Sequence, residues 1–300
     1  MEFADIVLKR IEGEENPKRS FNALVCFSNR DSGRALGKII DIIVHNRAGK
    51  SNITMLNLID SNKALEIEDD NVYKSNLLAD IISQIESDKF TVRTFVKEYD
   101  NFVNEVLKTA EEYDSELILI GTDKDIFNSH IWSKYLKLRG ENIIDEDSYH
   151  NELGEELTRT IRDISTMMNR NDQITGLLIG NKIKKIERVF IPILKDEDIL
   201  TLSYVCQFAK NQNITATIWD AIGILSNSHK MQKLFTTVSK KTDGRVKIWN
   251  NNKKISVDFI NTQDLMIIGK TGWDKLIFTP LSWINDLPST LIIKDKKIEA

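Results

Sequence analysis

"TQDLMIIG" (residues 262–269) repeats the pattern of "DSELILIG" (114–121): an acidic residue, then four apolar residues, then a glycine. A short apolar run rich in branched side chains is typical of a buried strand, and a glycine directly after it indicates a turn. Each stretch is the fourth of five such runs in its half of the chain. The pair therefore predicts an α/β fold made of two similar halves.

Helical patterns separate the predicted strands. Residues 32–46 carry apolar side chains at helical spacing, with Ser32 as the expected N-cap. Strand and helix in alternation imply a parallel sheet with right-handed crossovers. "NIT" opens the second strand in both halves. We interpret the chain as two copies of one unit, the second shorter, each with five parallel strands. The predicted strands are 22–29, 52–60, 90–99, 115–121 and 175–181, then 187–194, 213–220, 245–251, 263–269 and 289–295.

Composition is that of a globular protein, with 300 residues, 41% hydrophobic and 29% charged. A net charge of -4 argues against a nucleic-acid-binding surface. No apolar run approaches the ~20 residues that span a bilayer, and residues 1–20, which lack the apolar core of a secretory signal, are expected to be a linker. Cys26 and Cys206 lie in apolar segments, which predicts core packing in a reducing compartment.

Three stretches carry a resemblance to a known family: "IERVFIPIL" (186–194), "DLMIIGK" (264–270) and "LPSTLIIKD" (287–295). The chain resembles the universal stress protein family, and more narrowly the tandem stress-protein region that follows the membrane domain of some bacterial sodium/proton antiporters. The resemblance implies two Rossmann-like, adenine nucleotide alpha hydrolase-like units, each a five-stranded parallel sheet flanked by helices. They would span 21–182, with an insertion at 123–155, and 183–300.

The resemblance also implies where a nucleotide would bind. Family members that bind ATP carry an Asp at the end of the first strand and a loop of glycine, two residues, glycine, nine residues, glycine, then Ser or Thr. In the second unit Gly269 and Gly272 match the first two glycines, whereas Ser282 replaces the third and Trp283 replaces the hydroxyl residue. Leu194 stands where the Asp would be. The loop is therefore degenerate, and two glycines in a tight turn are the alternative interpretation.

The first unit offers a second candidate site for an anion or a nucleotide. Gly121 matches the first loop glycine, Lys124 replaces the second, and Ser28 takes the Asp position. Together with Asn29 and Thr122, these residues would gather at the carboxyl ends of the strands, where open α/β sheets bind ligands.

The insertion begins with an amphipathic pattern at 125–140. Phe127, Ile131 and Tyr135 fall on one helical face, with Trp132 beside it and basic residues flanking it. Three interpretations remain open: packing against its own domain, an interface with a partner or a second copy, and contact with a membrane surface.

No catalytic residue and no metal ligand is predicted. The four histidines show no metal-ligand spacing, and no nucleophile, base and oxyanion site come together. We therefore expect a non-enzymatic cytoplasmic regulatory module of a cation/proton antiporter, at the cytosolic face of the inner membrane. Its partner would be a membrane transport domain in the same full-length chain, without metal or nucleic acid, and a homodimer is left open. The alternative is a free-standing tandem stress protein that binds ATP or another adenine nucleotide.

Overall fold

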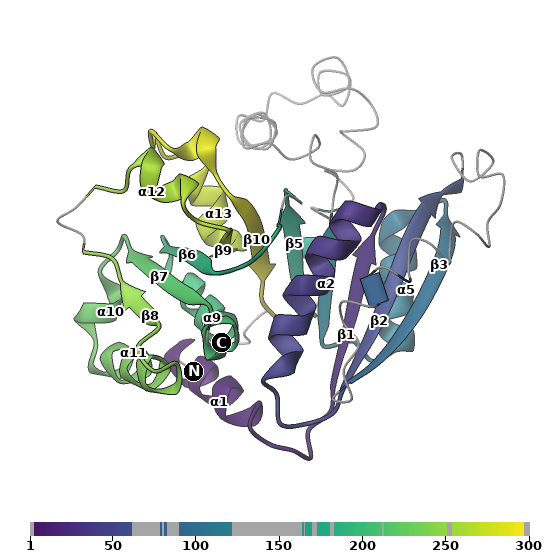
Figure 1. Cartoon of the computed structure of the whole chain (residues 1–300), viewed down its shortest axis with the longest axis horizontal. Coiled ribbons are helices and arrows are strands. Elements are labelled where there is room, and N and C mark those ends of the chain that lie inside the picture. Colours follow the sequence, from purple (N-terminus) through teal and green to yellow (C-terminus); the bar gives the residue numbers. More distant parts are fainter. Residues whose placement is uncertain are drawn as a thin grey trace.

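The computed structural model describes residues 3–61, 79, 81–82, 90–121, 164, 166–169, 173–180, 183–211, 213–250 and 254–296. The strands of these segments form one ten-stranded sheet in the order β3-β2-β1-β4-β5-β10-β9-β6-β7-β8 (Figure 1). The strands are β1 Phe21–Phe27, β2 Ser51–Asp60, β3 Phe90–Tyr99, β4 Leu117–Gly121, β5 Ile174–Ile179, β6 Arg188–Ile193, β7 Thr215–Asp220, β8 Val246–Ile248, β9 Leu265–Gly269 and β10 Ser289–Lys294.

The sheet is mostly parallel and is continuous through its centre. Within the described part of the chain, neighbouring strands pair in parallel except β5 and β10, which run antiparallel from Thr290 opposite Ile179 to Lys294 opposite Thr175. The expectation of two separate parallel sheets was wrong in this respect. Pairing β5 with β10 satisfies the backbone groups that two free edges would leave open, and no local sequence pattern reports such a distant pairing.

Helices cover both faces of the sheet. One core cluster joins the sheet to α1, α2, η1, α9 and α11, and the other joins it to α5, α12, α13 and the residues Ile164, Met167 and Met168. Strand β1 shows the alternation, because Val25 belongs to the first cluster and Leu24 and Cys26 belong to the second. Cys26 and Cys206 are buried and free, as predicted. The helices are α1 Phe3–Gly13, α2 Arg30–His45, α5 Phe102–Glu112, η1 Asp196–Thr201, α9 Leu202–Lys210, α10 Ile224–Asn227, α11 His229–Lys241, α12 Val257–Asn261, α13 Lys270–Leu276 and η2 Ile284–Asp286.

Helix α2 starts earlier than the sequence predicted. Its N-cap is Asn29, whose Oδ1 accepts a hydrogen bond from the backbone N–H of Ser32 at 2.9 Å. Because β1 ends at Phe27, the chain turns at once and the helix begins at Arg30. The prediction of Ser32 as the cap was therefore wrong: its N–H is the group that is capped.

The expected linker, 1–20, contains helix α1, which packs against η1, α9 and α11 of the second half (Figure 1). Ala4, Val7 and Ile11 are its fully buried residues. Arg10 donates two hydrogen bonds to the Asp295 carboxylate, at 2.5 and 2.7 Å. Helix α1 thereby ties the start of the chain to the residue that follows β10.

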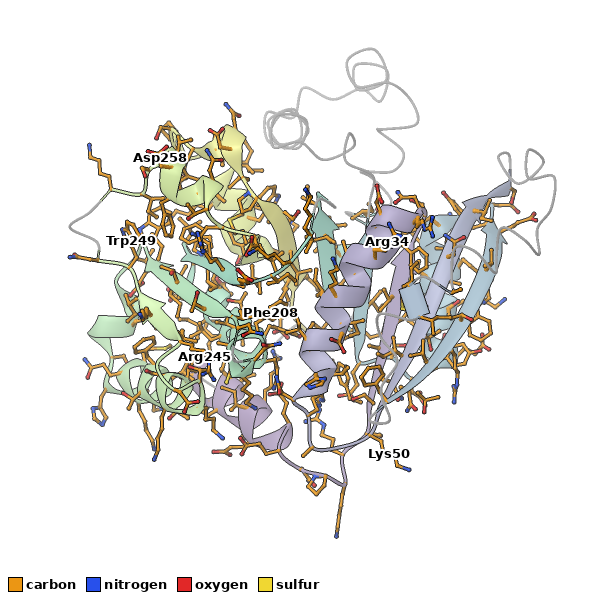
Figure 2. The ribbon with its side chains drawn as sticks, in the orientation of Figure 1. Arg34, Lys50, Phe208, Arg245, Trp249 and Asp258 are labelled. Atoms are coloured by element: carbon orange, nitrogen blue, oxygen red, sulfur yellow. The ribbon has the colours of Figure 1, made fainter. Side chains whose placement is uncertain are left out.

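An ionic cluster lies where α1 ends. Glu14 is buried, and its Oε1 is 3.5 Å from Nη1 of Arg47, which follows α2. Its Oε2 accepts a hydrogen bond from Gln207 of α9, the helix whose buried Phe208 lies near the middle of the molecule (Figure 2). Burial raises the pKa of Glu14 to about 7, although Arg47 acts against the rise. The cluster therefore links the start of the chain to both halves of the sheet.

No helix in the described ranges is long and apolar enough to cross a membrane. The segments that are described hold no group of three or more metal-ligating side chains that would suit an ion.

Candidate functional site

The site lies at the carboxyl ends of β6 and β9. Strand β6 pairs with β7 on one side and with β9 on the other, so the chain leaves β6 and β9 in different directions. Such a switch point forms a crevice that ligands of open α/β sheets use. Here η1 starts shortly after β6 ends, and α13 starts directly after β9 ends. Gly269 is the N-cap of α13, and Gly272 lies in its first turn.

The carboxylate of Asp198, in η1, fills the space between these two loops. Oδ2 accepts hydrogen bonds from the backbone N–H groups of Leu194 at 2.8 Å and Lys195 at 2.9 Å. Oδ1 accepts a third from the backbone N–H of Gly272 at 3.1 Å. Asp198 is 0% exposed. One buried carboxylate therefore binds backbone donors from both sides of the crevice.

The two loop glycines are needed because this carboxylate comes so close. A Cβ atom at Gly269 would lie 2.3 Å from Asp198 Oδ1, and one at Gly272 would lie 2.2 Å from Oδ2. Real Cβ atoms do not approach other heavy atoms to such distances, so any side chain at either position would displace Asp198. The two glycines, at the start of α13, thus leave room for the Asp198 carboxylate, and we call the two loops that enclose this carboxylate the cradle.

The surroundings of Asp198 raise its pKa above that of an exposed aspartate. Burial raises the pKa of Asp198 to about 6 and Glu197 adds to the rise, while the three backbone N–H groups act against it. Two lysines of α13 are engaged close by: Lys275 Nζ donates to the Leu194 carbonyl at 3.1 Å, and Lys270 pairs with Asp274. The charge of Asp198 is therefore held mainly by backbone dipoles.

The other two residues of the degenerate loop have different surroundings. Ser282 is exposed and lies between α13 and η2. Trp283 is 2% exposed, with its ring 6.0 Å from Phe190 and 5.9 Å from Trp219. The position that carries a hydroxyl in the family pattern is therefore part of the core.

A cleft of about 460 Å³ lies beside the cradle. Its walls come from the start of α13, from η1, from the end of β10 and from two more distant segments. Gly269 belongs to both the cradle and the cleft. The cleft is lined by Phe3, Met168, Asn169, Glu197, Leu200, Thr201, Gly269, Lys270, Thr271, Asp274, Ile293, Lys294, Asp295 and Lys296.

The candidate residues of the first half also meet at a switch point. Phe27 of β1 and Gly121 of β4 are partners in the sheet, so Ser28, Asn29 and Gly121 share one end of it. Ser28 is exposed. The Asn29 side chain caps α2, where Arg34 lies (Figure 2). A Cβ at Gly121 would lie 2.9 Å from the Cβ of Ser32, so this glycine allows α2 to pack closely.

Several predicted site residues lie outside the described residues. These are Thr122 and Lys124 of the first-half site, and the proposed interface residues Phe127, Ile131, Trp132 and Tyr135. Conversely, sequence reasoning missed Asp198. The available signal was an acidic residue shortly after a strand, but "KDED" (195–198) has the composition of a solvated charge run.

The sequence comparisons with known proteins identify no relative. No protein-family model matches the sequence, and no curated protein matches it. Among solved structures, a putative aspartate carbamoyltransferase from Leishmania major matches with 10% identity and a TM-score of 0.21, over 89% of this chain and 67% of the other. A similarity this weak carries no argument about fold or function.

Proposed function

We propose that this chain is a tandem pair of universal-stress-protein-like units, which serves as a non-catalytic cytosolic regulatory module of a cation/proton antiporter. The strand order supports the pairing. When each half is read from the outer edge of the sheet to its centre, its strands follow the same order: third, second, first, fourth and fifth along that half of the chain. The two runs are β3-β2-β1-β4-β5 and β8-β7-β6-β9-β10. The fourth strands, β4 and β9, are the matching segments "LILIG" and "LMIIG".

The proposal of a non-catalytic, regulatory role rests on one observation: the Asp198 carboxylate occupies the cradle. The resemblance would place the phosphates of a nucleotide against Gly269 and Gly272, and the Asp198 carboxylate is bound there by three backbone N–H groups. A second anion in that space would meet the charge and the atoms of Asp198. The second unit is therefore proposed as a structural and regulatory element that does not bind nucleotide.

Helix α1 is the proposed connection to a transport domain. The resemblance puts that domain before this region in the same chain. Helix α1 is fixed to the second half through Arg10 and Asp295 and to the first half through Glu14 and Arg47. A displacement of α1 would therefore act on both halves at once, as a coupling between two sites requires.

The alternative, a free-standing tandem stress protein that binds ATP or another adenine nucleotide, has one feature in its favour. The 460 Å³ cleft beside Gly269 offers Thr201, Thr271 and Lys296 next to apolar walls, a mixture typical of small-molecule sites.

The test is the size and location of the native protein. An antiserum raised against the purified chain would be used on membrane and soluble fractions of the source cells. The proposal expects a membrane-bound band far heavier than the 34.5 kDa of this chain. A single soluble band at 34.5 kDa would contradict it and favour the alternative.

A second experiment tests regulation itself. In everted membrane vesicles, the full-length protein would be compared with a version that lacks residues 21–296. The proposal expects sodium/proton exchange to persist with a changed dependence on sodium or proton concentration. Unchanged exchange curves would show that the region does not regulate transport.

A further inference from the structure

Glu14 lies where three parts of the chain meet. It follows α1 directly, and its backbone carbonyl accepts a hydrogen bond at 3.0 Å from the N–H of Ala48, in the loop after α2. Its side chain lies against Arg47 of the same loop and against Gln207 of α9. Residues 15–20, which connect it to β1, are all exposed. Glu14 is therefore the last packed residue at this end of α1, and α1 can detach only if Glu14 leaves its buried position.

The surroundings of Glu14 suit a neutral carboxyl better than a charged one. Its Oε1 is 3.5 Å from Nη1 of Arg47, longer than the ~2.7–2.9 Å of a charge-assisted hydrogen bond, and Arg47 also lies over the ring of Phe21. Gln207 donates to Glu14 through Nε2, whereas its Oε1 is buried and accepts no hydrogen bond from the described part of the chain. A neutral carboxyl would still accept from Nε2, and its own O–H would be a donor for Oε1.

We propose that the protonation state of Glu14 controls whether α1 stays docked on the second half. A neutral carboxyl keeps the end of α1 buried, and a charged carboxylate favours its release into water, where the charge is hydrated. Release would expose the surfaces of η1, α9 and α11 that α1 covers. It would also remove Phe3 from the wall of the cleft beside Gly269. This inference goes beyond the proposed function and does not depend on whether the chain belongs to a transporter.

The direction of the pH effect follows from burial. Burial raises the pKa of Glu14 from 4.5 to about 7, while nearby cations act against the rise, Arg47 most. Docking is therefore favoured fully below pH 4.5 and is weakened as the pH rises to about 7, by a factor of about 300 in the docking equilibrium. Burial raises the pKa of both Tyr204 and Cys206 further above neutral, so neither titrates in this window. The charged and titratable groups that face Glu14 are Arg10, Arg19, Arg47, Tyr204, Cys206 and Lys210.

Hydrogen–deuterium exchange followed by mass spectrometry measures the opening of α1 in the intact chain. After correction for the intrinsic pH dependence of exchange, the protection of the α1 amides should fall about 30-fold between about pH 5.5 and about pH 8.5. Helix α5 packs in the other core cluster and serves as the internal reference, so its protection should not follow this fall.

Two variants locate the effect at Glu14. Glu14→Gln keeps the size of the side chain and removes its charge, so its α1 should stay protected at the higher pH. Glu15→Gln is the matched control, because Glu15 is 51% exposed at its side chain and pairs with Lys241, and it should keep the fall of the unmodified chain. If Glu14→Gln does not fold, Glu14→Ala, which also lacks the charge, takes its place. Three results would overturn the proposal: constant α1 protection in the unmodified chain, an equal fall in the Glu14 variant, or loss of the fall in Glu15→Gln.

Discussion

Replacement of Gly272 by alanine should destabilise the protein strongly, although alanine is the better helix former. Gly272 lies inside α13, where the exchange alone would stabilise the helix by about 1 kcal/mol. The new Cβ would lie 2.2 Å from Asp198 Oδ2, 2.5 Å from Oδ1 and 2.6 Å from Cγ. The carboxylate must therefore move by about 1 Å to reach ordinary van der Waals contact.

That movement would break or stretch all three backbone hydrogen bonds of Asp198, which are 2.8 to 3.1 Å long. Each buried N–H left without an acceptor costs about 1–3 kcal/mol, and partial relaxation will recover some of this. We therefore expect a net loss of about 3–5 kcal/mol in the free energy of unfolding, after the gain in helix propensity.

Urea unfolding followed by tryptophan fluorescence measures the effect, since Trp273 is buried directly beside the substitution. Gly13→Ala is the matched control, because Gly13 ends α1 and its Cβ would meet only the flexible end of Arg19. The control should change stability by less than about 1 kcal/mol. If Gly272→Ala loses no more than Gly13→Ala, the reasoning about the carboxylate is wrong. In the Asp198→Gly background, Gly272→Ala should cost much less, which a double-mutant cycle would show.

Three further predictions concern other parts of the molecule. Glu14 has its pKa raised from 4.5 to about 7, so its contribution to stability is fully present below pH 4.5 and is lost as the pH rises to about 7. The loss amounts to about 3 kcal/mol, and urea unfolding at a series of pH values should show Glu14→Gln to be less pH-dependent across this window. ATP should bind no tighter than about millimolar at the occupied cradle, and a micromolar dissociation constant in calorimetry that Gly272→Ala abolishes would refute this. Arg10→Ala should lower the free energy of unfolding by about 2–3 kcal/mol, because the Asp295 carboxylate, 9% exposed at its side chain, loses its partner. In urea unfolding, the losses from Arg10→Ala and Asp295→Ala should be less than additive.

The strands could be predicted because their signal is local. Buried parallel strands are short apolar runs, and "LILIG" and "LMIIG" became β4 and β9 with all five residues buried in each. The pairing of β5 with β10 could not be predicted in this way. The sequence of each strand would be the same whether its free edge paired with the other strand or faced solvent. Residues 1–20 were expected to be a linker, and only the fold shows that α1 packs on the second half with Val7 and Ile11 buried.

The sequence located the two loop glycines but not the side chain that lies beside them. It left open a degenerate nucleotide loop and a tight turn, and the structure places the Asp198 carboxylate against Gly269 and Gly272. The burial of Asp198 could not be predicted, because a charge run such as "KDED" is usually solvated. Asp198 is buried only because the crevice between β6 and β9 closes over it, and that crevice exists only in the folded chain.

The central pairing of β5 with β10 limits how copies of this chain can associate through their sheet edges. Each half pairs its inner edge strand with the other half, so among the described residues β3 and β8 are the outer strands of the sheet. Strand β8 is three residues long, too short to recruit another strand, whereas β3 runs for ten residues. A second copy that extends the described sheet would therefore pair with β3. A chain cut between the halves would expose β5 and β10 as unpaired edge strands, which pair with each other in the intact chain.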